Sequence, residues 1–577
     1  MLPALPFPAR PLEAPPRRWS MRLHPATAVS GLMVALVLAR GVSTKPSTAA
    51  EPCALAAGRA EVGQAVAGRA SFKADTPRFA DPARREKLAG AFADIDRAAR
   101  QFVAAGHVPG AAWAIVVDGE LAHLGVAGTR RADDHAPVDG DTVFRIASMT
   151  KSFTAMAILA LRDAGKLSLD DSAERYVPEL KDLTYPTTDS PRITVRHLLS
   201  HAAGFPEDNP WGDQQLAATE EEFSAMMRRG IPFSNPPGLA YEYSNLGFAI
   251  LGRIVSRASG MPYRQYISER VLRPLGMTST TLEAAEVPAA RLAHGYRWED
   301  ERWKEEPPLP DGAFGSMGGM LTSIKDLSRY VGAFLDAWPA RDGAETAPIR
   351  RASLREMQQV WRPQPAVVGR DTGGGVRLNA GGYGFGLRIS QTCRFGQVVS
   401  HSGGLPGFGS LMRWLPEYGV GFIAFGSRTY TGWNGVADEA LELMANTGAL
   451  QPRAVQPSPA LLAAKDAVTT LMTAWDDALA DRIAAVNLFL DRSKDRRRGE
   501  FERLRTQLGS CRAGDRFEFV ENALRGEWLL QCERGRAHAE VTLAPTMPPT
   551  VQHMEVRAVS PDEGPRRQAC PDAGPGR

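Results

Sequence analysis

The sequence has no excess of charge of either sign, and it has few cysteines. Lys and Arg together number 68 and Asp and Glu 65, which leaves a net charge of +3. Proteins that bind nucleic acids need clustered positive charge, so this balance gives no support to that class. Only five cysteines occur in 577 residues, and none has the spacing of a zinc or redox motif. We therefore expect no nucleic-acid partner, no metal and no cofactor.

Three common catalytic signatures are also missing. The chain contains no G-x-S-x-G, no H-E-x-x-H and no G-x-x-x-x-G-K-[ST]. An α/β-hydrolase, a zinc protease of the H-E-x-x-H type and a P-loop enzyme are therefore not indicated. Hydrophobic residues nevertheless make up 44% of the chain and charged residues 23%, which is the balance of a soluble globular protein.

Beyond the N-terminal region, no segment is apolar enough to cross a membrane. The N-terminal run from Ala26 to Ala39 is short for a span, but it suits the core of a signal peptide. Arginines precede it, and small residues follow it. We interpret residues 1–50 as a signal peptide or an uncleaved anchor. Either predicts an exported protein, periplasmic or extracellular, that touches the membrane only through this segment.

Hydrophobic patterning divides the rest of the chain into two folded regions. In the first, apolar runs flank Asp118-Gly119 and predict a hairpin, and further strands and a helix lie near its end. This order predicts an α/β domain whose sheet forms from both ends of the segment. The predicted segments are a linker at 51–80, a domain at 81–448, a linker at 449–459, a small α+β domain at 460–560 and a disordered tail at 561–577.

The second region contains Cys511 and Cys532. A strand, a polar connection and another strand lie between them, so the two cysteines could face each other across a hairpin. We expect a disulfide here, and the alternative is two reduced, buried thiols. No pattern assigns this region a function, and a structural or dimerisation module is the simplest interpretation.

The most informative motif is Ser148-Met149-Thr150-Lys151, at the start of a nearly all-apolar helix. Residues i and i+3 share a helix face, so the Lys151 ammonium can reach the Ser148 hydroxyl. Burial lowers the pKa of a lysine, and a neutral lysine is a credible proton acceptor for a serine. The alternative is a helix N-cap followed by an ordinary first-turn lysine.

A second motif, Tyr243-Ser244-Asn245, opens another predicted helix. A tyrosine has an unperturbed pKa of about 10, so Tyr243 would need a nearby positive charge, such as that of Lys151, to act as a base. The amide of Asn245 has a donor and an acceptor, which suits it to hold a substrate amide. Alternatively, Tyr243 is a packed aromatic residue and Asn245 is a helix cap.

A third motif, His401-Ser402-Gly403-Gly404, follows a predicted strand. Glycines let a substrate lie against the strand backbone. A free N–H here could complete an oxyanion hole with the N–H of Ser148. The alternative is a glycine-rich turn with a surface histidine.

In this order, S-x-x-K, Y-x-N and H-x-G resemble the motifs of the serine β-lactamase and penicillin-binding-protein superfamily, in particular its class C β-lactamase and D,D-peptidase branch. The flanking segments 144–151, 193–201 and 237–245 are similar as well, and the resemblance covers roughly residues 85–446. It implies an α/β (α+β sandwich) domain, with an antiparallel sheet, helices on both faces and an all-helical subdomain.

The resemblance also implies a role for each motif residue. Ser148 would be the acylated nucleophile, Lys151 would assist its deprotonation, and Tyr243 would shuttle the proton. The residues expected to bind substrate or to form the oxyanion hole are Asn245, His401, Ser402, Gly403 and Gly404. Among these, Asn245 would hold the acyl amide, and Gly404 would give the second oxyanion N–H.

Position 401 is a histidine where class C β-lactamases typically have lysine. Histidine is only partly charged at neutral pH, so efficient β-lactam hydrolysis is not expected. We expect an exported serine hydrolase that acts on a small molecule or a short peptide ending in D-amino acids. An esterase or a weak class C-like β-lactamase is the alternative. A non-catalytic sensor of cell-wall fragments is a different class of answer, but the presence of Lys151 and Tyr243 argues against it.

Overall fold

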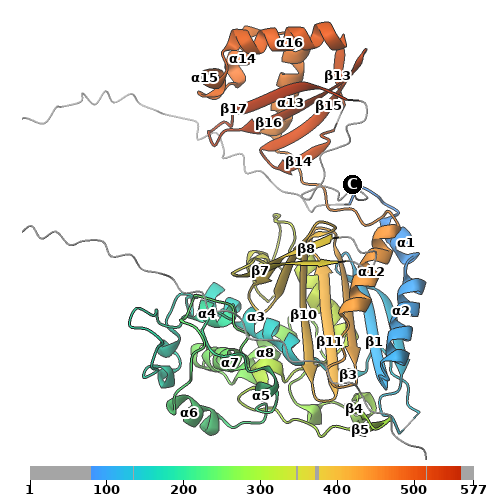
Figure 1. Cartoon of the computed structure of the whole chain (residues 1–577), viewed down its shortest axis with the longest axis vertical. Helices are drawn as coiled ribbons and strands as arrows, with labels where there is room; N and C mark the ends of the chain where they lie inside the picture. The colour runs from blue at the N-terminus through green and yellow to red at the C-terminus, as the bar shows by residue number, and fades with distance from the viewer. Residues whose placement is uncertain (1–78, 134, 346–347, 371–375, 515, 561–577) are drawn as a thin grey trace, which may run out of the picture. The chain divides into compact units, whose positions relative to one another are not determined.

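The computed structural model describes residues 79–133, 135–345, 348–370, 376–514 and 516–560 (Figure 1). The predicted segment 1–50, nearly all of the predicted linker 51–80 and the predicted tail 561–577 therefore lie outside the described residues. Within the described ranges, no helix is long and apolar enough to span a bilayer.

The larger region is built on an eight-stranded antiparallel sheet in which its two ends meet (Figure 1). β1 (Gly110–Val117) and β2 (Glu120–Gly128) form the predicted hairpin, and β1 also pairs with β12 (Val420–Gly426). The strand order is β2-β1-β12-β11-β10-β9-β8-β7. The other strands of this sheet are β7 (Arg362–Arg370), β8 (Val376–Tyr383), β9 (Arg388–Thr392), β10 (Gly396–Leu405) and β11 (Phe408–Leu415). The predicted antiparallel sheet from both ends of the region is confirmed.

Helices cover both faces of this sheet. α2 (Phe92–Ala105) and α12 (Asn434–Asn446) share one core with the alternate residues of β1 and β12 that point to that face. α10 (Ile324–Asp336) packs on the other face, where the core continues into α3 (Thr150–Asp163) and α7 (Asn245–Ser259). The start of this region forms two helices, α1 (Arg84–Ala89) and α2. They are separated at Gly90, a residue of low helix propensity.

A largely helical subdomain lies between β3 and β6 in the chain. Its helices and turns are η2 (Ala173–Arg175), η3 (Pro178–Leu180), α4 (Val195–Leu199), α5 (Asn209–Asp213), α6 (Glu220–Arg228), α7, α8 (Tyr263–Ile267), η4 (Ser268–Leu272), η5 (Ala284–Glu286), η6 (Ala289–Arg291) and α9 (Gly315–Gly318). Around it are the pairs β3 (Val143–Arg145) with β6 (Leu321–Ser323) and β4 (Tyr296–Glu299) with β5 (Arg302–Glu305), and α11 (Arg351–Met357) follows. The predicted helical subdomain is thus present.

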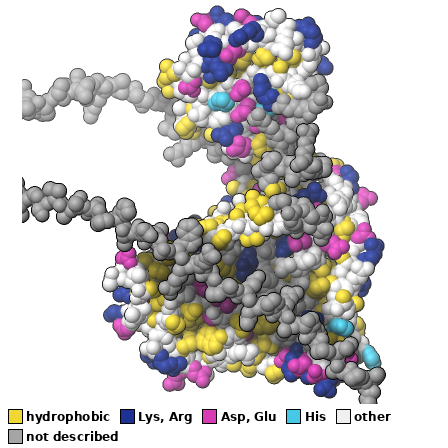
Figure 2. All heavy atoms as spheres, in the orientation of Figure 1, with side chains coloured by type: hydrophobic (Ala, Val, Ile, Leu, Met, Phe, Trp, Pro, Cys, Tyr) yellow, Lys and Arg dark blue, Asp and Glu magenta, His cyan; other side chains and the backbone are white. Residues whose placement is uncertain are grey.

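The C-terminal region is a small α+β unit, as predicted. α13 (Pro459–Thr473) and α16 (Lys494–Leu508) pack with the buried side chains of an antiparallel sheet ordered β13-β15-β16-β17, and β14 pairs with β15. The shorter helices are α14 (Asp477–Ile483) and α15 (Leu488–Asp491), and the strands are β13 (Cys511–Ala513), β14 (Phe519–Asn522), β15 (Arg525–Cys532), β16 (Gly535–Leu543) and β17 (Val551–Val559). On the face of the molecule in Figure 2, Lys and Arg side chains are interspersed with Asp and Glu.

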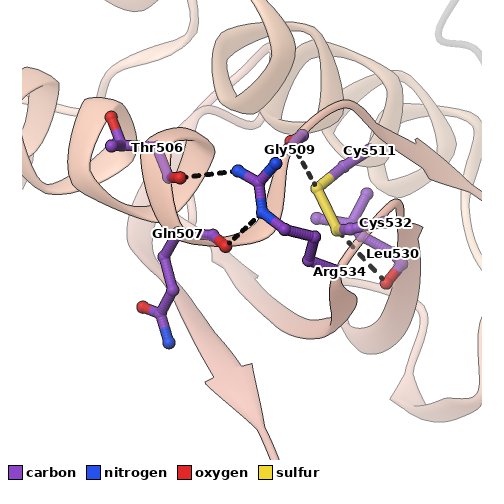
Figure 3. Close-up of a disulfide and its surroundings, with 7 residues drawn as sticks. All are labelled: Thr506, Gln507, Gly509, Cys511, Leu530, Cys532 and Arg534. Atoms are coloured by element: carbon purple, nitrogen blue, oxygen red, sulfur yellow. Dashed lines mark hydrogen bonds between the residues drawn. A yellow bond between two sulfur atoms is a disulfide. The ribbon is translucent and has the colours of Figure 1, made fainter.

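Cys511 and Cys532 form the predicted disulfide (Figure 3). They are direct partners in the register of β13 with β15, so the bridge joins two neighbouring strands. Cys511 lies on β13, a separate short strand. The first strand of the expected hairpin is β14, which follows β13 in the chain. Beside the bridge, Arg534 donates to the carbonyl oxygens of Gln507 (3.0 Å) and Thr506 (2.7 Å) and so caps the C-terminal end of α16 (Figure 3).

Removal of this bridge should destabilise the C-terminal region selectively. The bridge closes a loop with a sequence separation of 21, and a loop of this length is worth about 3 kcal/mol in the chain-entropy model. In the double variant Cys511→Ala/Cys532→Ala, hydrogen exchange of β15 and β16 should therefore speed up roughly a hundredfold. Exchange in β1 is the internal control and should not change. Equal protection of β15 in both proteins would contradict the prediction.

Candidate active site

Ser148 lies in a tight turn held against the sheet. It is in η1 (Ala147–Met149), which leads directly into α3, and its neighbour Ala147 has φ of 49°. A non-glycine residue in this left-handed region is strained, and surrounding contacts must hold it there. The backbone of the preceding Ile146 supplies two such contacts: its N–H donates to Met320 (3.0 Å), and its carbonyl accepts from the Ser410 hydroxyl (2.9 Å). The turn thereby presents Ser148, which is only 6% exposed, at a fixed point.

Lys151 points its ammonium at Ser148 from one helical turn later. Its Nζ lies 3.1 Å from Ser148 Oγ, 2.6 Å from Asn245 Oδ1 and 2.8 Å from the Met317 carbonyl oxygen. The side chain is completely buried, and burial lowers the pKa of Lys151 to about 7. Near neutral pH a large share of Lys151 is therefore uncharged and able to accept the Ser148 proton.

The ring of Tyr243 also lies against this ammonium. The Lys151 Nζ is 4.9 Å from the centre of the Tyr243 ring. Enclosure raises the pKa of the Tyr243 phenol well above its usual value, although a hydrogen bond with the Ser148 side chain acts in the opposite sense. The phenol therefore holds its proton in the free enzyme. In this geometry Lys151 can accept the proton of Ser148, and Tyr243, which keeps its own proton, can donate one.

Asn245 is fully buried at the start of α7, with both ends of its amide in contact with the protein. Its Oδ1 accepts from Lys151, and its Nδ2 makes a long contact of 3.4 Å with the Asn209 carbonyl oxygen on α5. Gly212 lets α5 come this close, because a Cβ there would lie 2.6 Å from Asn245 Nδ2. Asp208 fixes the helix start by accepting from the backbone N–H groups of Asn245 (2.6 Å) and Leu246 (2.8 Å).

The third motif reaches Ser148 because Gly403 has no side chain. A Cβ at Gly403 would lie 2.1 Å from the carbonyl oxygen of Ile146, two residues before Ser148. The strand β10 and the turn η1 can therefore touch only through glycine. Gly404 lies against the ring of Tyr430, which a Cβ there would meet at 2.4 Å. Ser402 is exposed.

His401 is not the partly charged residue that its ordinary pKa suggested. It is buried, and burial lowers the pKa of His401 to about 3, with the positive charge of Arg388 acting in the same direction. Both ring nitrogens are engaged: Nδ1 lies 2.7 Å from the Ser402 carbonyl oxygen, so it donates, and Nε2 accepts from the Tyr383 hydroxyl at 2.9 Å. The expectation of a histidine titrating near neutral pH was wrong, because it took no account of burial.

Arg388 is the permanent cation of this site, and the sequence analysis missed it. Its guanidinium carbon lies 5.9 Å from the centre of the Tyr243 ring, and its charge acts on Lys151 and His401. It begins β9, where it pairs in register with Ser400 on β10. Its place at the start of β9 becomes informative only once β9 is known to pair with β10.

His201 was not predicted as a site residue either, although its ring packs against the ring of Tyr243. The two rings are 4.4 Å apart, and His201 Nδ1 accepts from the Ser244 N–H at 3.1 Å. Burial lowers the pKa of His201 well below its ordinary value, so the ring is neutral. His201 thus supports the position of the tyrosine motif. In the described part of the chain, no group of three or more His, Cys, Asp or Glu is arranged to hold a metal.

The model of the beta-lactamase family matches residues 95–447, a stretch that contains all three motifs and most of the chain's length. The chain belongs to this family. Penicillin-binding protein 4* of Bacillus subtilis (strain 168) is 27% identical over 317 residues, which are 51% of this chain and 62% of that protein. Protein flp of Staphylococcus aureus (strain COL) is 27% identical over 320 residues, 55% of this chain and 59% of that protein. The chain thus spans about three-fifths of these relatives.

The fold has a counterpart among solved structures. An octameric penicillin-binding protein homologue from Pyrococcus abyssi aligns with a TM-score of 0.53 and 22% sequence identity. The alignment covers 78% of this chain and 96% of that one. At this identity the likeness shows the fold alone.

Proposed function

We propose that this member of the beta-lactamase family is a serine hydrolase that works through an acyl-enzyme on short peptides ending in D-amino acids. The observation that carries the proposal is the hydrogen bond from Lys151 Nζ to Ser148 Oγ, made by a lysine whose pKa burial lowers to about 7. Family membership and the presence of Tyr243 and Asn245 at the same place support it.

The reaction follows from these positions. Neutral Lys151 accepts the proton of Ser148, and Ser148 Oγ attacks the carbonyl carbon of the scissile bond. The backbone N–H groups of Ser148 and Gly404 stabilise the negative charge that develops on the carbonyl oxygen. Tyr243, which holds a proton, donates it to the leaving amine as the bond breaks. Lys151 then returns its proton to the Tyr243 phenolate and is neutral again. It next takes a proton from water, whose oxygen attacks the ester carbonyl at Ser148, and this proton passes to Ser148 Oγ as the acid is released.

Arg388 favours a substrate with a carboxylate on its leaving group. Because His401 is neutral, the permanent positive charge close to Tyr243, the proton donor to the leaving group, is that of Arg388. A peptide with a free C-terminus brings a carboxylate to this side of the bond, whereas a simple ester does not. An esterase remains the second candidate, since the steps at Ser148 are the same and need no carboxylate.

Arg388→Gln should remove a preference for the carboxylate. We expect kcat/KM for N-acetyl-D-alanyl-D-alanine to fall roughly 10- to 100-fold, the usual scale for a hydrogen bond to a charged group. The rate with its C-terminal amide should change by less than about threefold. Arg394→Gln, an exposed arginine that pairs with Glu442, is the matched control and should leave both rates intact. Equal losses on peptide acid and amide would refute the role and favour the esterase.

Export is also a proposal. It is supported by the signal-like composition of residues 1–50 and by the Cys511–Cys532 disulfide, because disulfides persist in oxidising compartments. A periplasmic or extracellular location would also bring the enzyme to peptides that contain D-amino acids. A sensor that is acylated without turnover would label once and release no product, so product release in the same assay decides between sensor and enzyme.

A further inference from the structure

Asp213, at the end of α5, is a buried carboxylate that no step at Ser148 uses. Only 1% of the residue is exposed. Its Oδ2 accepts from the Tyr430 hydroxyl at 2.8 Å, and its Oδ1 has no hydrogen-bond partner among the described residues. An unpartnered carboxylate oxygen in such a place is costly, and it calls for a ligand or another explanation.

Two contacts locate Asp213 in the site, one made by its sequence neighbour Gly212 and one made by its hydrogen-bond partner Tyr430. Gly212 lies on the amide of Asn245, and the ring of Tyr430 lies on Gly404. The hydrogen bond from Tyr430 to Asp213 therefore joins the Asn245 side of the site to the Gly404 side. The family resemblance implies that Asn245 holds the acyl amide, and the proposed reaction puts the scissile carbonyl oxygen at Gly404. The acyl part of the substrate then lies between these sides, so Asp213 borders the acyl group and not the leaving group.

Tyr430 is itself held in an unusual conformation. It has φ of 52°, in the left-handed region that non-glycine residues avoid, and about half of it is exposed. Strain of this kind is kept where the surroundings require it, often at ligand sites. Here the backbone conformation of Tyr430 directs its hydroxyl at Asp213 Oδ2, and Asp213 Oδ1 is left as the free acceptor.

The charges around Asp213 favour a cation. Lys151 is the positive group that acts on it, while Asp208 and Glu207 add negative charge. Lys151 already donates to Ser148, Asn245 and Met317, so it is not a partner for Oδ1. Asp208 is committed to the backbone of α7. Neither of these described side chains pairs with Oδ1, which leaves this oxygen open to a group brought by the substrate.

We propose that Asp213 selects substrates with an ammonium group on the acyl side of the scissile bond. The inference rests on the proposed function and names its substrate class more closely: an amide whose acyl part carries a free α-amino or side-chain amino group. Tyr430 is the positioning residue that fixes the carboxylate.

Two pairs of p-nitroanilides test this on the full chain. One pair is the anilides of Nα-acetyl-D-lysine and Nα-acetyl-D-norleucine, and the other is the anilides of D-alanine and N-acetyl-D-alanine. In the first pair only the side-chain ammonium differs, and in the second pair a neutral acetamide replaces the α-ammonium. We expect wild type to prefer the cationic member of at least one pair by about tenfold or more in kcat/KM, and Asp213→Asn to abolish that preference.

Asp208→Asn is the matched control, since Asp208 is a half-buried carboxylate that also acts on both Lys151 and Asp213. It should lower or raise all four rates together and keep the preference. If Asp213→Asn also changes all four rates equally, Asp213 acts through Lys151 and the proposal is wrong. Absence of a charge preference in wild type overturns it as well.

The experiment separates this proposal from the proposed function. The anilides carry no leaving-group carboxylate, so failure of the Arg388 prediction would leave their result valid. If the anilides turn over too slowly, the same compounds are compared as inhibitors of p-nitrophenyl acetate hydrolysis, and equal inhibition within each pair overturns the proposal. Failure to hydrolyse even that ester would instead refute the serine hydrolase assignment.

Discussion

Replacing Ser148 with alanine will abolish covalent labelling by a fluorophosphonate probe and will reduce turnover to background. Ser148 is a hydroxyl in contact with a buried lysine of lowered pKa, the condition that activates a serine. The side chain makes few other contacts, so the melting temperature should change by only a few degrees. Mass spectrometry of the labelled tryptic peptide is the direct measurement.

Ser390→Ala serves as the control for this experiment. Ser390 lies on β9, on a strand next to the site, and pairs in register with Val398. It should keep wild-type labelling and turnover. Labelling that persists in Ser148→Ala with the fold intact would place the nucleophile elsewhere and would refute the assignment of all three motifs.

Lys151→Ala will lower kcat/KM by at least about a hundredfold, the scale expected for loss of a general base. The sign of the pH dependence follows from the proton: the ammonium cannot accept, so activity requires the neutral form. Because burial lowers the pKa of Lys151 to about 7, wild-type kcat/KM on a neutral ester should rise with pH through about 7 and then level off. The residual activity of Lys151→Ala should lack this rise.

Tyr243→Phe distinguishes the proton donor from the proton acceptor. A p-nitrophenolate leaves without a proton, whereas an amine needs one. The variant should therefore lose far more activity on a peptide than on a p-nitrophenyl ester. His401 should add no limb to the profile between pH 5 and 8, since burial lowers its pKa to about 3. A wild-type rate independent of pH between 5 and 9 would contradict the role of Lys151.

Much of the site could be predicted because its residues follow local rules. Ser148 and Lys151 are three residues apart on one helix, so their proximity depends only on helical geometry. The hairpin at Asp118-Gly119 likewise follows from turn chemistry. Both predictions are independent of how distant segments of the chain pack.

What could not be predicted depends on contacts between distant segments. Arg388 belongs to the site because β9 pairs with β10, and no local pattern marks it. His401 is neutral because its burial beside Tyr383 lowers its pKa, and the residue type alone does not reveal this burial. The strand β7 is hard to predict as well: Pro363 and Pro365 argue against a central strand, and the structure places β7 at the sheet edge, where proline is tolerated.

The pairing of β1 with β12 has a consequence for biosynthesis. Ala111 is in register with Gly426, so a ladder inside the sheet joins residues made at opposite ends of this region. A ribosome adds about 5–20 residues per second, so β1 waits tens of seconds for its neighbour. Until then, its apolar strand is available to chaperones and to other nascent chains. A truncation before position 420 should yield insoluble protein, and no active N-terminal fragment can be expected from this gene.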